Sequence, residues 1–230
     1  MSPYLHLVAS LGPALAALIM ARVQGPLPLR RLAARAIAAP PTWIAVAIGA
    51  PIGLYLLAAG VLLLLGYDVD LGATGRSLEY PMLGIGTYAL FNVVCYGVGE
   101  ELGWRGFALP RLQSTMSATR ASLVIAVGWA LWHLPLFLFA GMSTMGSADA
   151  IGWLASIVAG SFLMTALFNA SGGSVLAVAL FHGALDVLIG SPTGGPLQTA
   201  MGVAVTILGL TLPFRYGRAN LAPRPRVVDA

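Results

Sequence analysis

Long apolar stretches recur along this chain of 230 residues, of which 58% are hydrophobic and only 9% are charged. A soluble domain carries about 25% charged residues, so this chain lacks the polar surface needed to cover its apolar residues in water. A membrane-spanning helix needs roughly 20 mostly apolar residues. The sequence therefore predicts an all-α, polytopic transmembrane bundle of about seven helices, at residues 4–21, 43–66, 81–104, 121–140, 151–169, 174–190 and 197–213.

The basic residues indicate how this bundle is oriented. All 12 are arginines, and 11 of them fall on one side of a seven-helix path. Positive charge accumulates on the cytoplasmic side of membrane proteins, which predicts an outer N-terminus and a cytoplasmic C-terminus. This distribution accounts for the positive charge better than nucleic-acid binding does. The eleven are Arg22, Arg30, Arg31, Arg35, Arg105, Arg111, Arg120, Arg215, Arg218, Arg224 and Arg226.

Three parts are predicted along the chain. Residues 1–80 hold N-terminal membrane helices and a basic cytoplasmic loop, residues 81–190 a core, and residues 191–230 the last membrane helix and a basic tail. Within them, residues 22–42 are expected to form a loop or an interfacial helix, and residues 219–230 a flexible tail. No basic region precedes the first apolar stretch, so we expect a retained helix rather than a cleaved signal peptide.

Five ionisable residues remain at membrane depth once the loop charges are set aside. Glu100 and Glu101 belong to the third predicted helix, His133 to the fourth, and His182 and Asp186 to the sixth. Ionisable residues inside a membrane are rare and usually line a cavity or take part in chemistry. The sequence therefore predicts an active site in the cytoplasmic half of the bilayer.

Spacing assigns faces to the third predicted helix. Glu101 and Arg105 are four residues apart, so they share a face and are expected to form an ion pair that anchors the helix end. Glu100 is rotated about 100° from Glu101 and is free to face the bundle interior as a base that takes a proton from water. Gly99 and Gly103 would let a neighbouring helix approach closely.

The two histidines have different settings. His182 and Asp186 have the same four-residue spacing, so both side chains project together. His133 sits just before Pro135, which frees a backbone carbonyl. Other residues of this region are expected to have structural roles only: Arg111 and Arg120 as topology determinants, and Trp43, Trp129, Trp132 and Trp153 as lipid or interface contacts.

At these residues the chain resembles the CPBP family, the Abi or CAAX-protease family of intramembrane endopeptidases, which includes the eukaryotic type 2 CAAX prenyl endopeptidase. The family pattern is EExxxR, then an aromatic residue four positions before a histidine, then HxxxN or HxxxD. Here these are Glu100 to Arg105, Trp129 to His133, and His182 to Asp186. The resemblance covers roughly residues 80–190.

The resemblance implies hydrolysis of a peptide bond within or beside the membrane, with CAAX-type processing as one form of it. It assigns to Glu100 and His133 the activation of a water, and to His182 and Asp186 the binding of the developing oxyanion. Glu101 and its arginine partner would hold the geometry. The substrate would be a peptide or a membrane-anchored protein, and the site would open to the cytoplasm from a bacterial plasma membrane.

The residue at position 186 departs from the asparagine of many relatives. Asparagine can donate a hydrogen bond to an oxyanion, whereas an ionised aspartate cannot. Asp186 could be protonated, orient His182, or join His133 and His182 as a zinc ligand. Because the HExxH spacing of zinc proteases is absent, we favour a metal-independent glutamate protease without a cofactor.

Two other function classes fit the same residues. Glu, His and Asp in membrane helices also serve as proton relays, so a proton-coupled transporter is one alternative. Such carriers commonly have inverted repeats, and this sequence has no evident internal symmetry. A non-catalytic bacteriocin-immunity or scaffold membrane protein is the other alternative.

Overall fold

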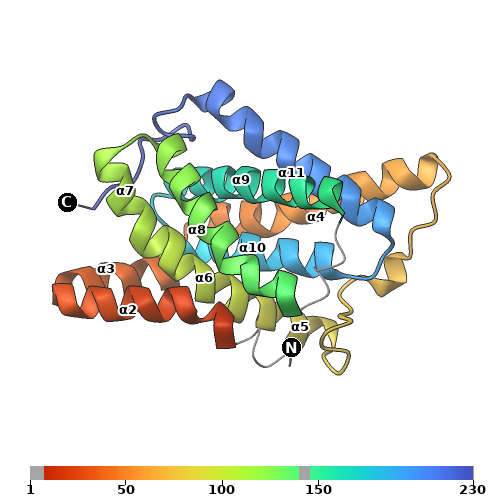
Figure 1. The fold of residues 1–230 in the computed structure, drawn as a ribbon, viewed down its shortest axis with the longest axis horizontal. Helices are drawn as coiled ribbons and strands as arrows, with labels where there is room; N and C mark the ends of the chain where they lie inside the picture. The colour runs from red at the N-terminus through yellow and green to blue at the C-terminus, as the bar shows by residue number, and fades with distance from the viewer. Residues whose placement is uncertain (1–7, 140–145, 230) are drawn as a thin grey trace.

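The computed structural model describes residues 8–139 and 146–229, and within these ranges every regular element is a helix (Figure 1). The predicted all-α bundle is confirmed. Its elements are α2 (Gly12–Gln24), α3 (Pro26–Ile37), α4 (Pro41–Leu64), η1 (Leu71–Ala73), α5 (Ile85–Phe91), η2 (Asn92–Val98), α6 (Gly99–Glu101), η3 (Leu102–Ala108), α7 (Leu109–Thr115), α8 (Ala118–Phe139), α9 (Ser147–Ala170), α10 (Val175–Gly190) and α11 (Gly195–Tyr216).

Each of the seven predicted stretches overlaps a helix, but residues 11, 65–66, 81–84 and 174 are turn or loop, and residues 4–7 and 140 lie outside the described ranges. Three helices, α4, most of α9 and α11, are individually long and apolar enough to cross a membrane. Their outer faces are apolar as well: Leu56 and Leu57 of α4 are 58% and 65% exposed, and Ile207 of α11 is 58% exposed. An aqueous surface rarely exposes apolar side chains so densely, so these faces suit lipid.

The third predicted helix is longer than expected and contains two π-helical segments. The prediction ended it at residue 104 and placed Arg105 in a loop, but the chain stays helical from Ile85 to Thr115. Arg105 is fully buried inside this helix, and Leu109 beyond it is also fully buried. The prediction was wrong because it took a basic residue after an apolar stretch for the membrane boundary. Here buried packing continues past that residue.

Two π-helical segments, η2 and η3, flank the single turn α6 that contains Glu100 and Glu101. A π-helix is rare and is found most often at functional sites, because its wider winding redirects side chains and backbone carbonyls. The glutamates are therefore presented from a locally distorted part of an otherwise continuous helix.

Close helix packing surrounds this distorted segment. A methyl group on Gly99 would lie 2.8 Å from the Ser10 carbonyl oxygen, and one on Gly103 would lie 2.6 Å from that of Pro13. The expected close approach is thus present, and the neighbour is α2 with the residues just before it. On another side, a methyl on Gly183 of α10 would lie 2.8 Å from the Val93 backbone in η2.

The turn between α9 and α10 fixes the start of the helix that contains His182. Gly172 and Gly173 have φ values of 75° and 94°, a left-handed conformation that glycine adopts without strain. Ser174 then caps α10 by accepting a hydrogen bond from the Ala177 amide at 3.1 Å. Its hydroxyl donates to the Ala38 carbonyl at 2.7 Å, which ties α10 to the chain after α3.

The basic segment after the first helix is a helix, α3, rather than a loop. Leu32 on its inner face is 2% exposed, while Arg30 and Arg31 are exposed. A helix with one apolar and one basic face is typical of a membrane interface. It lies alongside α2, as Figure 1 shows.

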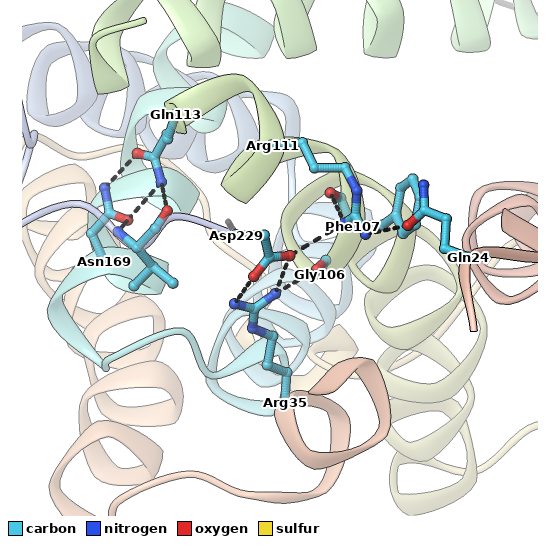
Figure 2. A network of polar contacts seen from close by, with 9 residues as sticks. Gln24, Arg35, Gly106, Phe107, Arg111, Gln113, Asn169 and Asp229 are labelled. Carbon is cyan, nitrogen blue, oxygen red and sulfur yellow. Dashed lines mark hydrogen bonds and ion pairs between the residues drawn. The ribbon is translucent and has the colours of Figure 1, made fainter. Parts of the chain in front are cut away.

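The segment after α11 is packed against the bundle, so the predicted flexible tail is wrong for residues 219–229. Leu221 is fully buried and Ala222 is 4% exposed. Asp229 accepts from Arg35 at 2.8 Å and from Arg111 at 3.2 Å (Figure 2). Proline and arginine suggested an exposed tail, but two guanidinium groups from α3 and α7 bind its carboxylate instead.

A second set of bonds holds the same tail. The Gln113 amide donates to Asn169 Oδ1 at 3.1 Å and to the Val227 carbonyl at 2.7 Å. The Val227 amide in turn donates to Asn169 Oδ1 at 3.0 Å, and Figure 2 shows these bonds beside the arginine–aspartate contacts. These bonds and the two arginine–aspartate contacts hold the tail together. Because Arg111 binds Asp229, it has a structural contact in addition to its predicted role in topology.

We expect Gly103→Ala to lower the stability of the fold by about 1–3 kcal/mol, because two backbones cannot separate without losing their packing. Thermal unfolding in detergent measures this. Gly86→Ala is the matched control, since no atom lies within 4 Å of its added methyl. Equal stability of the Gly103 variant and the control would contradict the close α2 contact.

We expect Asp229→Asn to lower the free energy of unfolding by about 1.5–3 kcal/mol, because it removes the anion between two guanidinium groups. The same thermal measurement applies, with Asp68→Asn on an exposed loop as the control for loss of one carboxylate. A tail that contributes nothing to the fold would leave both variants at wild-type stability.

Candidate active site

Trp129 of α8 is the common neighbour of the predicted site residues. It is 6% exposed, and its indole N–H donates to Glu100 Oε2 at 2.6 Å. Its ring lies edge-on to those of His133 and His182, with centroids 5.6 and 5.5 Å apart. The structure therefore brings the third, fourth and sixth predicted helices together around one aromatic ring.

The two adjacent glutamates have different partners, as the helical phase predicted. Glu100 is 4% exposed and accepts from Trp129. Glu101 is fully buried, and its Oε1 accepts from Arg105 at 2.9 Å. The predicted ion pair is present, although it lies within the helix rather than at its end.

Arg105 links this pair to two further helices. Its second terminal nitrogen donates to the Ser161 hydroxyl of α9 at 3.3 Å, and Ser161 donates to the Ser122 carbonyl of α8 at 2.9 Å. The guanidinium carbon also lies 5.1 Å from the centre of the Trp129 ring, within the range of a cation–π contact. The buried Arg105 guanidinium group thus contacts Glu101, Ser161 and Trp129 and helps to orient their side chains.

His182 lies between two carboxylates. Its Nδ1 is 2.9 Å from Glu101 Oε1, and its Nε2 is 3.5 Å from Asp186 Oδ2. Because a carboxylate only accepts hydrogen bonds, Nδ1 carries a proton in this arrangement. The shared face of His182 and Asp186 was predicted from their spacing, whereas the contact with Glu101 was not.

His133 is held by its own helix. Its Nδ1 lies 2.7 Å from the Trp129 carbonyl, and a carbonyl only accepts, so Nδ1–H is the donor. Its ring also lies 6.0 Å from that of Trp153 of α9, again edge-on. The ring orientation of His133 is therefore set by two tryptophans.

Asp186 is partly accessible, with 34% of its side chain exposed. In the alternative zinc set it would join His133 and His182. Within the described ranges, no three His, Cys, Asp or Glu side chains are grouped so that they could hold a metal ion. The Asp186 carboxylate lies 3.5 Å from His182 Nε2.

Sequence reasoning missed three members of this cluster. Trp129 and Trp153 were expected at lipid or at the interface, yet Trp129 is buried and both contact His133. The four-residue spacing from Trp129 to His133 was a usable signal. No sequence signal pointed to Ser161, because its contact with Arg105 joins residues 56 positions apart.

We expect Glu101→Gln to destabilise the fold by about 3–5 kcal/mol, because it leaves the Arg105 cation buried without a counter-ion. Glu100→Gln is the matched control: its amide oxygen still accepts from Trp129, so its stability should stay within about 1 kcal/mol of the wild type. Thermal unfolding of both variants in detergent compares them. Equal losses would contradict the different roles of the two glutamates.

Comparison with known proteins places this cluster in a family. The model described as type II CAAX prenyl endopeptidase Rce1-like matches residues 82–188, a range that includes every predicted site residue. The chain is also 47% identical over 47 residues to CAAX prenyl protease 2 of Methanococcus maripaludis. That alignment covers 20% of this chain and 17% of the relative. With its apolar helices and this match, the chain is an integral membrane protein whose residues 82–188 match the Rce1-like family of type II CAAX prenyl endopeptidases.

Proposed function

We propose that the protein is an intramembrane endopeptidase that hydrolyses a peptide bond of a membrane-associated protein or peptide, as in CAAX-type processing. One observation carries the proposal. Glu100, a buried carboxylate, accepts a hydrogen bond from Trp129, whose ring also contacts His133 and His182. The match to a family of endopeptidases supports the same reading.

Glu100 is the general base of the proposed reaction. The Trp129 N–H holds Oε2, so Oε1 is the oxygen that positions a water and takes its proton as the water attacks the scissile carbonyl. His133 contacts the same water and helps to position it. Its ring is held in orientation by Trp129 and Trp153. Glu100 then gives the proton to the departing amine, which restores the carboxylate.

His182 stabilises the oxyanion that this attack creates. Glu101 holds one proton on Nδ1, so Nε2 donates to the carbonyl oxygen, as it becomes negative, when His182 is the doubly protonated imidazolium. Asp186 lies 3.5 Å from the same nitrogen and keeps a proton there in the free enzyme. This role differs from direct oxyanion binding, which an ionised aspartate would oppose.

Water has a physical reason to enter this buried site. Among the described residues, Glu101 Oε2 and Arg105 Nε are buried without a hydrogen-bond partner. Buried polar atoms of this kind are commonly satisfied by ordered water. The proposed reaction uses protein groups alone, without a metal cofactor, and its site opens toward the arginine-rich, cytoplasmic side of a bacterial plasma membrane.

Cleavage of a peptide library in detergent tests the proposal, with prenylated and unprenylated members. Glu100→Gln should lower the rate by about 10²–10⁴-fold, the usual contribution of a general base. Asp68→Asn, on an exposed loop, should cleave like the wild type. Wild-type activity should survive a chelator.

Two results would overturn parts of this proposal. Cleavage that is unchanged in Glu100→Gln would remove Glu100 from the reaction. Loss of wild-type activity in chelator, restored by zinc, would replace the metal-independent mechanism with a metal-dependent one.

A further inference from the structure

A cavity lies at the start of α8, at the opposite end of this helix from His133. Its volume is about 790 Å³, within the range of roughly 300–1,000 Å³ that is usual for ligand sites. It opens between the first turn of α8 and the last turns of α11, which Figure 1 shows at one end of the bundle. Its walls include Arg120, Leu123, Phe162, Leu210, Phe214 and Arg218.

Hydrogen bonds between the two walls fix their spacing. The Thr119 amide and hydroxyl both donate to the Arg218 carbonyl, at 3.2 and 3.0 Å, and the Ala118 amide donates to the Ala219 carbonyl at 3.0 Å. These bonds join the start of α8 to the chain that follows α11. These bonds hold the backbones of Arg120 and Arg218 beside each other at the rim of one cavity.

The two guanidinium groups have no acidic partner within the described ranges. The salt bridges there involve Arg35, Arg105 and Arg111, each with an aspartate or glutamate, whereas Arg120 and Arg218 are exposed. A guanidinium group presents paired N–H donors that match the oxygens of a phosphate. Two such groups lining one opening suit a single anionic group.

The rest of the cavity is apolar. Leu123 and Leu210 are 41% and 43% exposed, Phe214 is 86% exposed, and Phe162 at 5% closes the base. A soluble anion would gain nothing from these side chains. A ligand with a charged head and a hydrocarbon chain would contact both parts, since the arginines and the apolar side chains line the same cavity.

We propose that this cavity binds an anionic phospholipid, with its phosphate between Arg120 and Arg218 and an acyl chain along Leu123, Leu210 and Phe214. The position on the arginine-rich side matches the leaflet in which anionic lipids are enriched. The proposal does not depend on the protease function, because none of these residues contacts the candidate active site.

Native mass spectrometry of the purified full chain in a neutral detergent tests the proposal. Dioleoyl phosphatidylglycerol, dioleoyl phosphatidylcholine and soluble glycerol phosphate are titrated separately. The wild type should retain phosphatidylglycerol at about tenfold lower concentration than the double variant Arg120→Gln/Arg218→Gln does. It should retain phosphatidylcholine and glycerol phosphate no better than that variant.

The control is Arg30→Gln/Arg31→Gln, which removes two exposed arginines from α3 on the same side. It should retain phosphatidylglycerol like the wild type, and equal loss in both double variants would mean that net charge alone attracts the lipid. Retention of glycerol phosphate as strong as that of the lipid would overturn the lipid assignment. If the arginine variant is not monodisperse, Phe214→Ser decides: unchanged retention of phosphatidylglycerol would refute the proposal, and weakened retention would support it.

Discussion

A buried ion pair holds the centre of this bundle together. Glu101 and Arg105 are both fully buried, and each charge is tolerable in an apolar interior only while the other neutralises it. Glu101 also accepts from His182 of α10, and Arg105 donates to Ser161 of α9. Three helices are thereby positioned around one pair of charges, and Glu100 takes its place from the residue beside it.

Close backbone packing keeps that pair where it is. Gly99 and Gly103 let α2 lie directly against the helix of the glutamates, and Gly183 lets α10 approach η2 from another side. In a membrane, lipid is as apolar as the helix surfaces, so helices associate through close contact and hydrogen bonds rather than through burial from water. The π-helical winding on both sides of α6 accommodates these approaches and sets the direction of Glu100 and Glu101.

Hydropathy and spacing were sufficient for much of this architecture. Apolar length located the helices, and four-residue spacing found both the Glu101–Arg105 pair and the shared face of His182 and Asp186. The same reasoning failed where the residue types suggested the end of a packed segment but the packing continues. A basic residue seemed to end a helix that in fact continues to Thr115, and a proline-containing tail seemed flexible although Asp229 is bound by two arginines.

Composition and helix spacing were enough to predict the all-helical membrane class, the candidate residues for chemistry and the contacts between neighbours on one helix. These follow from composition and from the fixed period of an α-helix. Which helices face each other is seen in the folded chain alone: Trp129 binds Glu100, and His182 pairs with Glu101 across 81 positions of sequence. Such contacts depend on the rotation and depth of each helix in the bundle, and packing around small residues and buried charges sets both.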